Sequence, residues 1–210
     1  MSRKEQRVDY TLDPKGIKDL PFTDIKAILR GADELIATGG RSLLAKILKG
    51  SRDKKLLQYG LDLNPVYGFY KELKVEDITA RIDWLIKKGY LDIEYRGRLP
   101  VIIYTERGWE IERDAYSDEL LEKLGSLIPG GDYSFVNELK DRNRGMILLL
   151  LDKIKKTGDR GFIPLLQTWE EIDYRKVREE IAKVINHLEK GGDMSGNMID
   201  PRDYRLRNQK

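Results

Sequence analysis

Between residues 75 and 105 the hydrophobic pattern changes from the period of a helix to that of paired strands. Over residues 75–88 the apolar positions fall at i, i+4, i+7 and i+8, which makes one buried stripe: Ile78, Ile82, Leu85 and Ile86. Residues 90–95 and 99–105 are rich in Ile, Val and Tyr, and they flank a turn that reads Arg96-Gly97-Arg98. This order predicts a helix that is followed directly by a two-stranded hairpin.

Shorter helical segments precede this pair. Thr23 is a plausible N-cap for a first helix, and a second helix is expected to end at Gly50. Ser51 or Asp53 can then open a further short turn of helix. Helices that lead into a two-stranded hairpin have the order of a winged helix, an α+β module that is used most often on nucleic acid.

The second half of the sequence is helical. Five segments separated by Gly, Pro or Asp are expected to form helices: residues 117–127, 133–140, 144–156, 161–171 and 174–190. The predicted fold class is therefore mainly α with a small β-hairpin (α+β), a winged helix followed by an all-α domain. The predicted organisation is a flexible arm, a winged-helix domain, a helical domain and a flexible tail: residues 1–20, 21–114, 115–190 and 191–210.

The absence of cysteine excludes whole classes of site. With no Cys among 210 residues, disulfides, thiolate zinc sites, iron–sulfur clusters and cysteine nucleophiles are ruled out. The single His, His187, rules out sites that need two imidazoles, and no apolar run approaches the ~20 residues of a membrane span. No carboxylate pair stands in an apolar frame suited to acid–base work. We therefore expect a cytoplasmic protein without catalytic residues, metal or cofactor, and without a membrane partner.

Positive charge is concentrated in one short stretch. Basic residues outnumber acidic ones by only 39 to 36, but residues 41–58 hold six cations against one acid, Asp53. Gly50-Ser51 at a helix start would offer backbone N–H groups and a hydroxyl to a phosphate, with four cations around them: Lys49, Arg52, Lys54 and Lys55. We name residues 49–55 the basic turn. It is a candidate phosphate-binding patch, and a solvated helix face is the alternative.

Residues 22–113 resemble the RQC domain, the winged helix that follows the helicase core in RecQ helicases. The resemblance rests on an ordered series at matching spacing: Leu48-Lys49-Gly50-Ser51 with Leu56, Tyr59-Gly60, Tyr67-Gly68 with Lys71, Leu85-Ile86 with Gly89-Tyr90-Leu91, and Tyr104-Thr105 with Gly108. It implies binding to duplex or branched DNA, a wing that separates strands in some members, and a position that contacts the DNA backbone at Lys71.

The sequence also departs from that family. It has no G-x-x-x-x-G-K-[ST] loop for ATP, and it lacks the cysteines of the RecQ zinc subdomain. Some relatives place an aromatic residue near the wing tip to stack on the terminal base pair. Here the tip reads Arg96-Gly97-Arg98-Leu99, and Tyr95 is the nearest aromatic residue and the candidate for stacking. The resemblance therefore carries over DNA binding, but not unwinding powered by this chain.

Part of the second half resembles a HEAT repeat. The similarity lies in Gly158-Asp159, Ile163-Pro164-Leu165-Leu166, Asp173, Val177-Arg178 and the apolar series Ile181, Val184 and Leu188. The resemblance implies a helix pair in which the Pro bends the first helix and the Val-Arg pair opens the second, and a surface that binds protein or nucleic-acid backbone. A helical cap that only stabilises the first domain is the alternative.

The exposed side of the helix at residues 75–88 is poorly suited to the major groove. The charges expected there cancel: Glu76, Asp77 and Asp83 against Arg81, Lys87 and Lys88. Acids that face phosphates cost affinity, so we expect binding through the basic turn, Lys71 and the wing. Contacts of that kind read few base edges.

These observations predict a non-enzymatic DNA-binding protein that is selective for DNA structure and tolerant of sequence. The expected partner is duplex, forked or branched DNA at the nucleoid. A separate helicase or nuclease is the candidate protein partner, in repair, recombination or replication. The predicted DNA contacts are Lys49, Ser51, Arg52, Lys54, Lys55, Lys71, Tyr95, Arg96 and Arg98. The alternative is an adaptor that docks protein or RNA through its winged helix and helical repeats.

Overall fold

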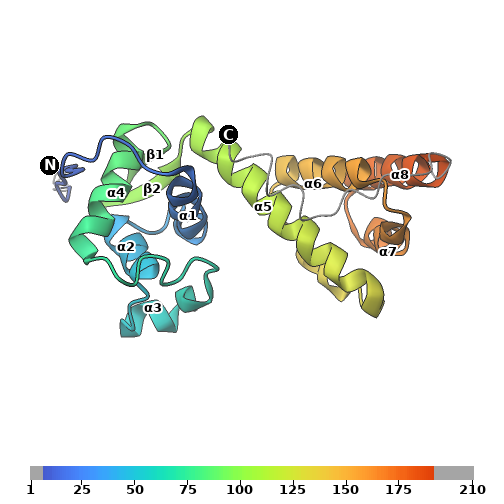
Figure 1. Ribbon diagram of the computed structural model, residues 1–210, viewed down its shortest axis with the longest axis horizontal. Helices are drawn as coiled ribbons and strands as arrows, with labels where there is room; N and C mark the ends of the chain where they lie inside the picture. Colours follow the sequence, from blue (N-terminus) through green and yellow to red (C-terminus); the bar gives the residue numbers. More distant parts are fainter. Residues whose placement is uncertain (1–6, 192–210) are drawn as a thin grey trace, which may run out of the picture. The chain divides into compact units, whose positions relative to one another are not determined.

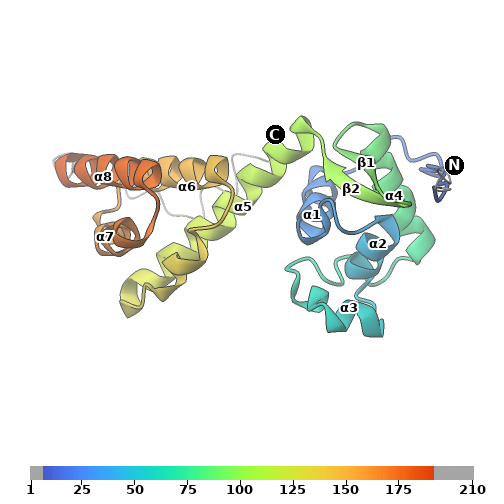
Figure 2. The same ribbon diagram turned by 180° about the vertical axis from the view of Figure 1, so that it is seen from behind.

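The computed structural model describes residues 7–191 and divides the chain into two compact units, with the boundary between Arg113 and Asp114. Both units are built mainly from helices, and the first one carries a two-stranded antiparallel sheet (Figure 1, Figure 2). The predicted class, mainly α with a small hairpin, is therefore confirmed. The predicted tail at residues 191–210 lies outside the described residues apart from Gly191.

The first unit has the element order of a winged helix. Its elements are α1 (Phe22–Ala32), η1 (Asp33–Leu35), α2 (Arg41–Lys49), α3 (Lys54–Gln58), η2 (Leu61–Leu63), α4 (Val75–Lys87), β1 (Leu91–Arg96) and β2 (Leu99–Tyr104). The strands pair in the register Leu91 to Tyr104 and Arg96 to Leu99, which leaves a two-residue turn at Gly97 and Arg98. The predicted turn also included Arg96, which belongs to β1. On its other edge β2 bonds to the segment before α2, since Ile102 donates to the Gly39 carbonyl at 2.9 Å.

The predicted apolar stripe of α4 forms the middle of the first core. Ile78, Ile82 and Leu85 are fully buried, and Ile86 is half-buried against the same cluster. They pack with fully buried side chains from the other elements of the unit: Ile28, Leu29, Leu44, Leu48 and Ile102. Burial of this apolar surface is the main favourable term in the stability of the unit.

Residues 7–20, which the sequence placed in a flexible arm, lie against the hairpin and α4 in the structure. The Val8 N–H donates to the Arg98 carbonyl at 3.0 Å, and Leu20 is buried in the core. Further along, Lys15 Nζ contacts Asp77 Oδ1 at 2.9 Å, and the indole N–H of Trp84 donates to the Lys18 carbonyl at 3.4 Å. Apart from the burial of Leu20, these contacts are made by polar side chains and backbone groups. A search for apolar periodicity in the arm could not indicate them.

Asp83 is buried, although the sequence placed it on the exposed side of its helix. Its side chain accepts a hydrogen bond from the Asp13 N–H at 2.8 Å and pairs with the Arg41 guanidinium, which also donates to the Thr11 carbonyl at 3.1 Å. A buried carboxylate is tolerated only where it is paired and hydrogen-bonded, and these partners meet that condition. The α4 face that was expected to show balanced charges is thus partly covered by the arm.

The second unit begins within a long helix and continues as three more. Its elements are α5 (Glu106–Leu127), η3 (Ile128–Gly130), η4 (Ser134–Glu138), α6 (Arg144–Thr157), η5 (Arg160–Phe162), α7 (Ile163–Ile172) and α8 (Arg175–Lys190). Fully buried Leu150, Leu166, Trp169 and Ile181 lie at the centre of its core.

Three local predictions for the second unit were wrong. The helix expected at residues 117–127 starts already at Glu106, and the segment at residues 133–140 is a short 3₁₀ turn. Pro164 lies in the first turn of α7, where its missing N–H costs nothing, so it starts that helix and does not bend it. The HEAT assignment itself stays a prediction.

The structure shows why Thr105 and Gly108 occur together in the motif Tyr104-Thr105 with Gly108. The Thr105 hydroxyl accepts a hydrogen bond from the Gly108 N–H at 3.1 Å and contacts the Tyr90 carbonyl oxygen at 3.0 Å. A Cβ at Gly108 would overlap that same carbonyl oxygen. The start of α5 can therefore approach the start of β1 only because residue 108 has no side chain.

This contact predicts opposite effects for two identical substitutions in α5. Gly108→Ala should lower the free energy of unfolding by about 2 kcal/mol, because the backbone must move to admit the methyl group. Gly125→Ala should raise it by about 0.5–1 kcal/mol, because its Cβ would meet only Phe162 at an ordinary 3.7 Å and alanine favours the helix. Thermal unfolding followed by circular dichroism measures both, and equal effects would contradict the overlap at Gly108.

Candidate nucleic-acid interface

The position of the basic turn is fixed by the backbone conformation and hydrogen bonds at the C-terminal end of α2. Gly50 adopts the left-handed conformation with φ 73°, and its N–H donates to the Ile47 carbonyl. The loop that precedes α4 returns to the same helix end, where the Gly68 N–H bonds to Ile47 at 2.9 Å and the Tyr70 N–H bonds to Leu48 at 2.8 Å. A Cβ on Gly50 would lie 3.0 Å from Gly68 Cα, so this close approach needs a residue without a side chain at position 50.

The predicted phosphate cradle at Gly50-Ser51 is wrong. Both N–H groups already donate to carbonyls of α2, Gly50 to Ile47 and Ser51 to Lys46. The Ser51 hydroxyl accepts from the Asp53 N–H at 3.3 Å, and Asp53, not Ser51, is the N-cap of α3. The two amides of the predicted cradle therefore have partners within the chain, and a phosphate at this point would be bound by side chains.

Two of the six cations in residues 41–58 are engaged elsewhere. Arg41 belongs to the buried pair with Asp83. Lys46 Nζ contacts Asp53 Oδ2 at 2.7 Å, and this bond together with the Lys55 N–H holds the pKa of the Asp53 carboxyl below its usual value. The cations that remain on the basic turn are the four predicted ones: Lys49, Arg52, Lys54 and Lys55.

The structure brings the basic turn together with the loop before α4. Lys49 Nζ donates to the Lys71 carbonyl, and the Tyr67 hydroxyl donates to the Ser51 carbonyl at 2.9 Å. The exposed Lys71 thus lies beside Lys49, as a shared phosphate-binding surface requires. Lys74, exposed in the same loop, was missed because charge was counted only up to residue 58.

The arm contacts Tyr95, the aromatic residue that the sequence suggests for stacking on a base, and Tyr95 is half-buried. The Arg7 guanidinium lies 4.7 Å from the centre of its ring, and the ring of Tyr10 lies 6.1 Å away. Its hydroxyl donates to the Val8 carbonyl at 2.9 Å. The arm therefore lies against Tyr95, a contact between residues almost ninety positions apart that no local pattern reveals, and the stacking role of Tyr95 stays a prediction.

The wing tip carries charge at the other end of the unit from the basic turn. Arg96 and Arg98 are exposed there, and Leu99 beside them is 61% exposed. Figures 1 and 2 both show α3 and the hairpin at opposite ends of the first unit. The predicted residues therefore form two separate basic surfaces, one at the basic turn with Lys71 and one at the wing tip.

The described part of the chain contains neither a cluster of metal-binding side chains nor a membrane-spanning helix. Among residues 7–191 no three or more His, Asp or Glu side chains gather so that they could hold a metal ion. Nor is any helix in that range long and apolar enough to cross a membrane.

Comparison with known families identifies the first unit. The model of the RQC domain matches residues 22–118, which include α1 to α4, the hairpin and the start of α5. Neither the curated proteins nor the solved structures gave a match. The matched span contains the basic turn, Lys71 and the wing, and the RQC domain is associated with DNA binding in RecQ-related proteins. Residues 22–118 of this chain therefore match the RQC domain, and this match suggests a DNA-binding role related to that of RecQ.

Proposed function

We propose that this chain is a non-enzymatic DNA-binding protein that selects DNA by structure and tolerates changes of sequence. The observation that carries the proposal is the contrast between two surfaces of the RQC domain. The arm contacts α4 at Asp77, Asp83 and Trp84, whereas the four cations of the basic turn make no ion pair with an acid among residues 7–191. A helix that is covered in this way does not read base edges, and exposed cations bind phosphates of any sequence.

The sequence lacks the ATP-binding loop that a helicase needs, and this supports a role beside a separate enzyme. The chain has no ATP-binding loop, no cysteine and one histidine. We propose that it serves as an accessory factor in repair, recombination or replication at the nucleoid in the cytoplasm. In that role it supplies DNA contacts to a separate helicase or nuclease.

An adaptor function is the second candidate, and one observation favours it. Three large apolar side chains are exposed around α3, namely Leu57, Tyr59 and Leu63, and Leu63 is 83% exposed. A group of exposed apolar side chains on one short segment is typical of a surface that docks protein. Under this alternative the basic turn would only be solvated.

The salt dependence of binding to forked DNA tests the basic turn. Lys54→Gln with Lys55→Gln should flatten the slope of log K against log salt by about 2, because two phosphate contacts are lost. The matched control is Lys87→Gln with Lys88→Gln, which removes the adjacent lysine pair at the end of α4. We expect this control to leave the slope unchanged. An equal change in both variants would contradict the assignment, and weak binding that neither variant alters would favour the adaptor.

A second prediction concerns what the domain recognises in DNA. Shuffling the base sequence of a fork should change the affinity less than replacing the fork by a blunt duplex of the same composition, because phosphate contacts carry no sequence information. Competition binding with labelled fork measures both. A larger effect of shuffling would mean that the domain reads base edges after all.

A further inference from the structure

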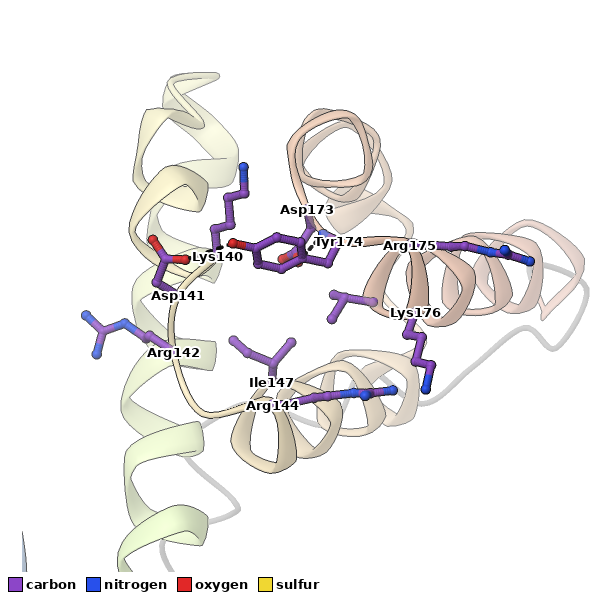
Figure 3. Close-up of a pocket in the computed structure, with 10 residues that line it drawn as sticks. Lys140, Asp141, Arg142, Arg144, Ile147, Asp173, Tyr174, Arg175 and Lys176 are labelled. Atoms are coloured by element: carbon purple, nitrogen blue, oxygen red, sulfur yellow. Dashed lines mark hydrogen bonds between the residues drawn. The ribbon is translucent and has the colours of Figure 1, made fainter.

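The second unit contains a pocket of ≈590 Å³ that the RQC domain does not include. It lies where α6 and α8 begin, beside the segment that joins η4 to α6 (Figure 3). Ile147 and Val177 supply apolar side chains, and the polar lining that matters here is Lys140, Asp141, Arg144, Asp173, Tyr174 and Lys176. The volume is within the range of about 300–1,000 Å³ that ligand pockets occupy, so a nucleotide-sized group fits.

Three cations of this pocket are available to a ligand. Lys140, Arg144 and Lys176 are exposed and make no ion pair with any other residue in the range 7–191. Two further cations point away in Figure 3. Of these, Arg142 contacts the Tyr116 hydroxyl and Arg175 pairs with Glu179 at 3.0 Å. The positive charge of the pocket is therefore carried by Lys140, Arg144 and Lys176.

The two carboxylates of the pocket already have partners. Asp173 is buried and accepts hydrogen bonds from the indole N–H of Trp169 at 2.7 Å and from the Tyr174 N–H at 2.6 Å. Asp141 accepts from the Tyr174 hydroxyl at 3.3 Å, and its negative charge raises the pKa of that phenol. These bonds stabilise the two carboxylates without neutralising them, and the three available cations outnumber them, so the lining stays net positive.

Backbone groups add to this field. The α8 helix has no side-chain cap, and its first N–H groups, at Arg175 and Lys176, open at the pocket together with the positive end of the helix dipole. The α6 helix begins at the same pocket with Arg144. At the start of α6 the Asn143 side chain already accepts hydrogen bonds from the Gly145 and Met146 N–H groups, so α6 contributes only the Arg144 side chain. Cations and one uncapped helix start at a concave site favour an anion with several oxygens, such as a phosphate.

We propose that this pocket binds phosphates of the nucleic-acid backbone, as a second contact site separate from the RQC domain. The inference rests on the proposed DNA-binding function and extends it to the helical unit. Tyr174 favours nucleic acid over an acidic peptide, because its ring is 59% exposed beside Lys140 and can lie against a sugar or base.

The test is salt-dependent binding of the full chain to forked DNA. Arg144→Gln with Lys176→Gln removes two pocket cations at the starts of α6 and α8, and Lys155→Gln with Lys190→Gln removes two exposed cations near the ends of the same helices. The pocket variant should flatten the slope of log K against log salt by about 2, and the control should leave it unchanged. Circular dichroism of both variants checks that the helices persist.

Each outcome decides the inference. A pocket variant that binds forked DNA as the control does overturns it. Binding to poly-glutamate is measured as well. A pocket variant that binds forked DNA normally but loses binding to poly-glutamate also overturns the inference, because the pocket would then dock acidic protein. The basic-turn variant is measured in parallel and separates the two proposals. Loss of binding only in the basic-turn variant would show that the pocket is not a DNA contact site. Loss of binding only in the pocket variant would show that the basic turn is not one. If the wild-type chain does not bind the fork, both proposals fail.

Discussion

The buried ion pair between Arg41 and Asp83 fixes three segments of the first unit to one another. Arg41 begins α2, Asp83 lies in the middle of α4, and the arm bonds to the pair through Thr11 and Asp13. Removing either partner would leave a charge buried without compensation, which is strongly destabilising. Because this pair holds the arm on α4, the helix that a winged helix usually places in the major groove is partly covered. Contacts with DNA then fall to the surfaces that the arm leaves exposed.

Those surfaces depend on the second constraint, the meeting of Gly50 and Gly68. Their close approach lets the loop before α4 bond to the end of α2, and it places Lys71 beside Lys49. Cations from two segments thus share one surface, although the N–H groups of Gly50 and Ser51 are already bonded within the chain. An interface of side-chain cations binds phosphates without reading sequence, which agrees with the function proposed for the RQC domain.

Local patterns in the sequence predicted the parts of the structure that depend on interactions between residues close in sequence. The apolar period gave α4, and the turn at Gly97 gave the register of the hairpin. The errors arose where a partner distant in sequence decides the outcome. Asp83 is buried because Arg41 pairs with it, and Tyr95 is half-buried because Arg7 and Tyr10 lie beside it. The pocket in the second unit was also invisible, since the starts of α6 and α8 meet only in the folded chain.

Amide hydrogen exchange of the full chain, with and without forked DNA, tests the central claim most directly. The claim is that the RQC domain binds through the basic turn and the neighbouring loop, while α4 stays covered by the arm. The account predicts that DNA slows exchange in residues 49–55 and 67–74 and leaves the exchange of α4 and of residues 7–20 unchanged. Protection of α4 together with faster exchange in the arm would show that the arm is displaced and that α4 enters the groove, which would contradict the account.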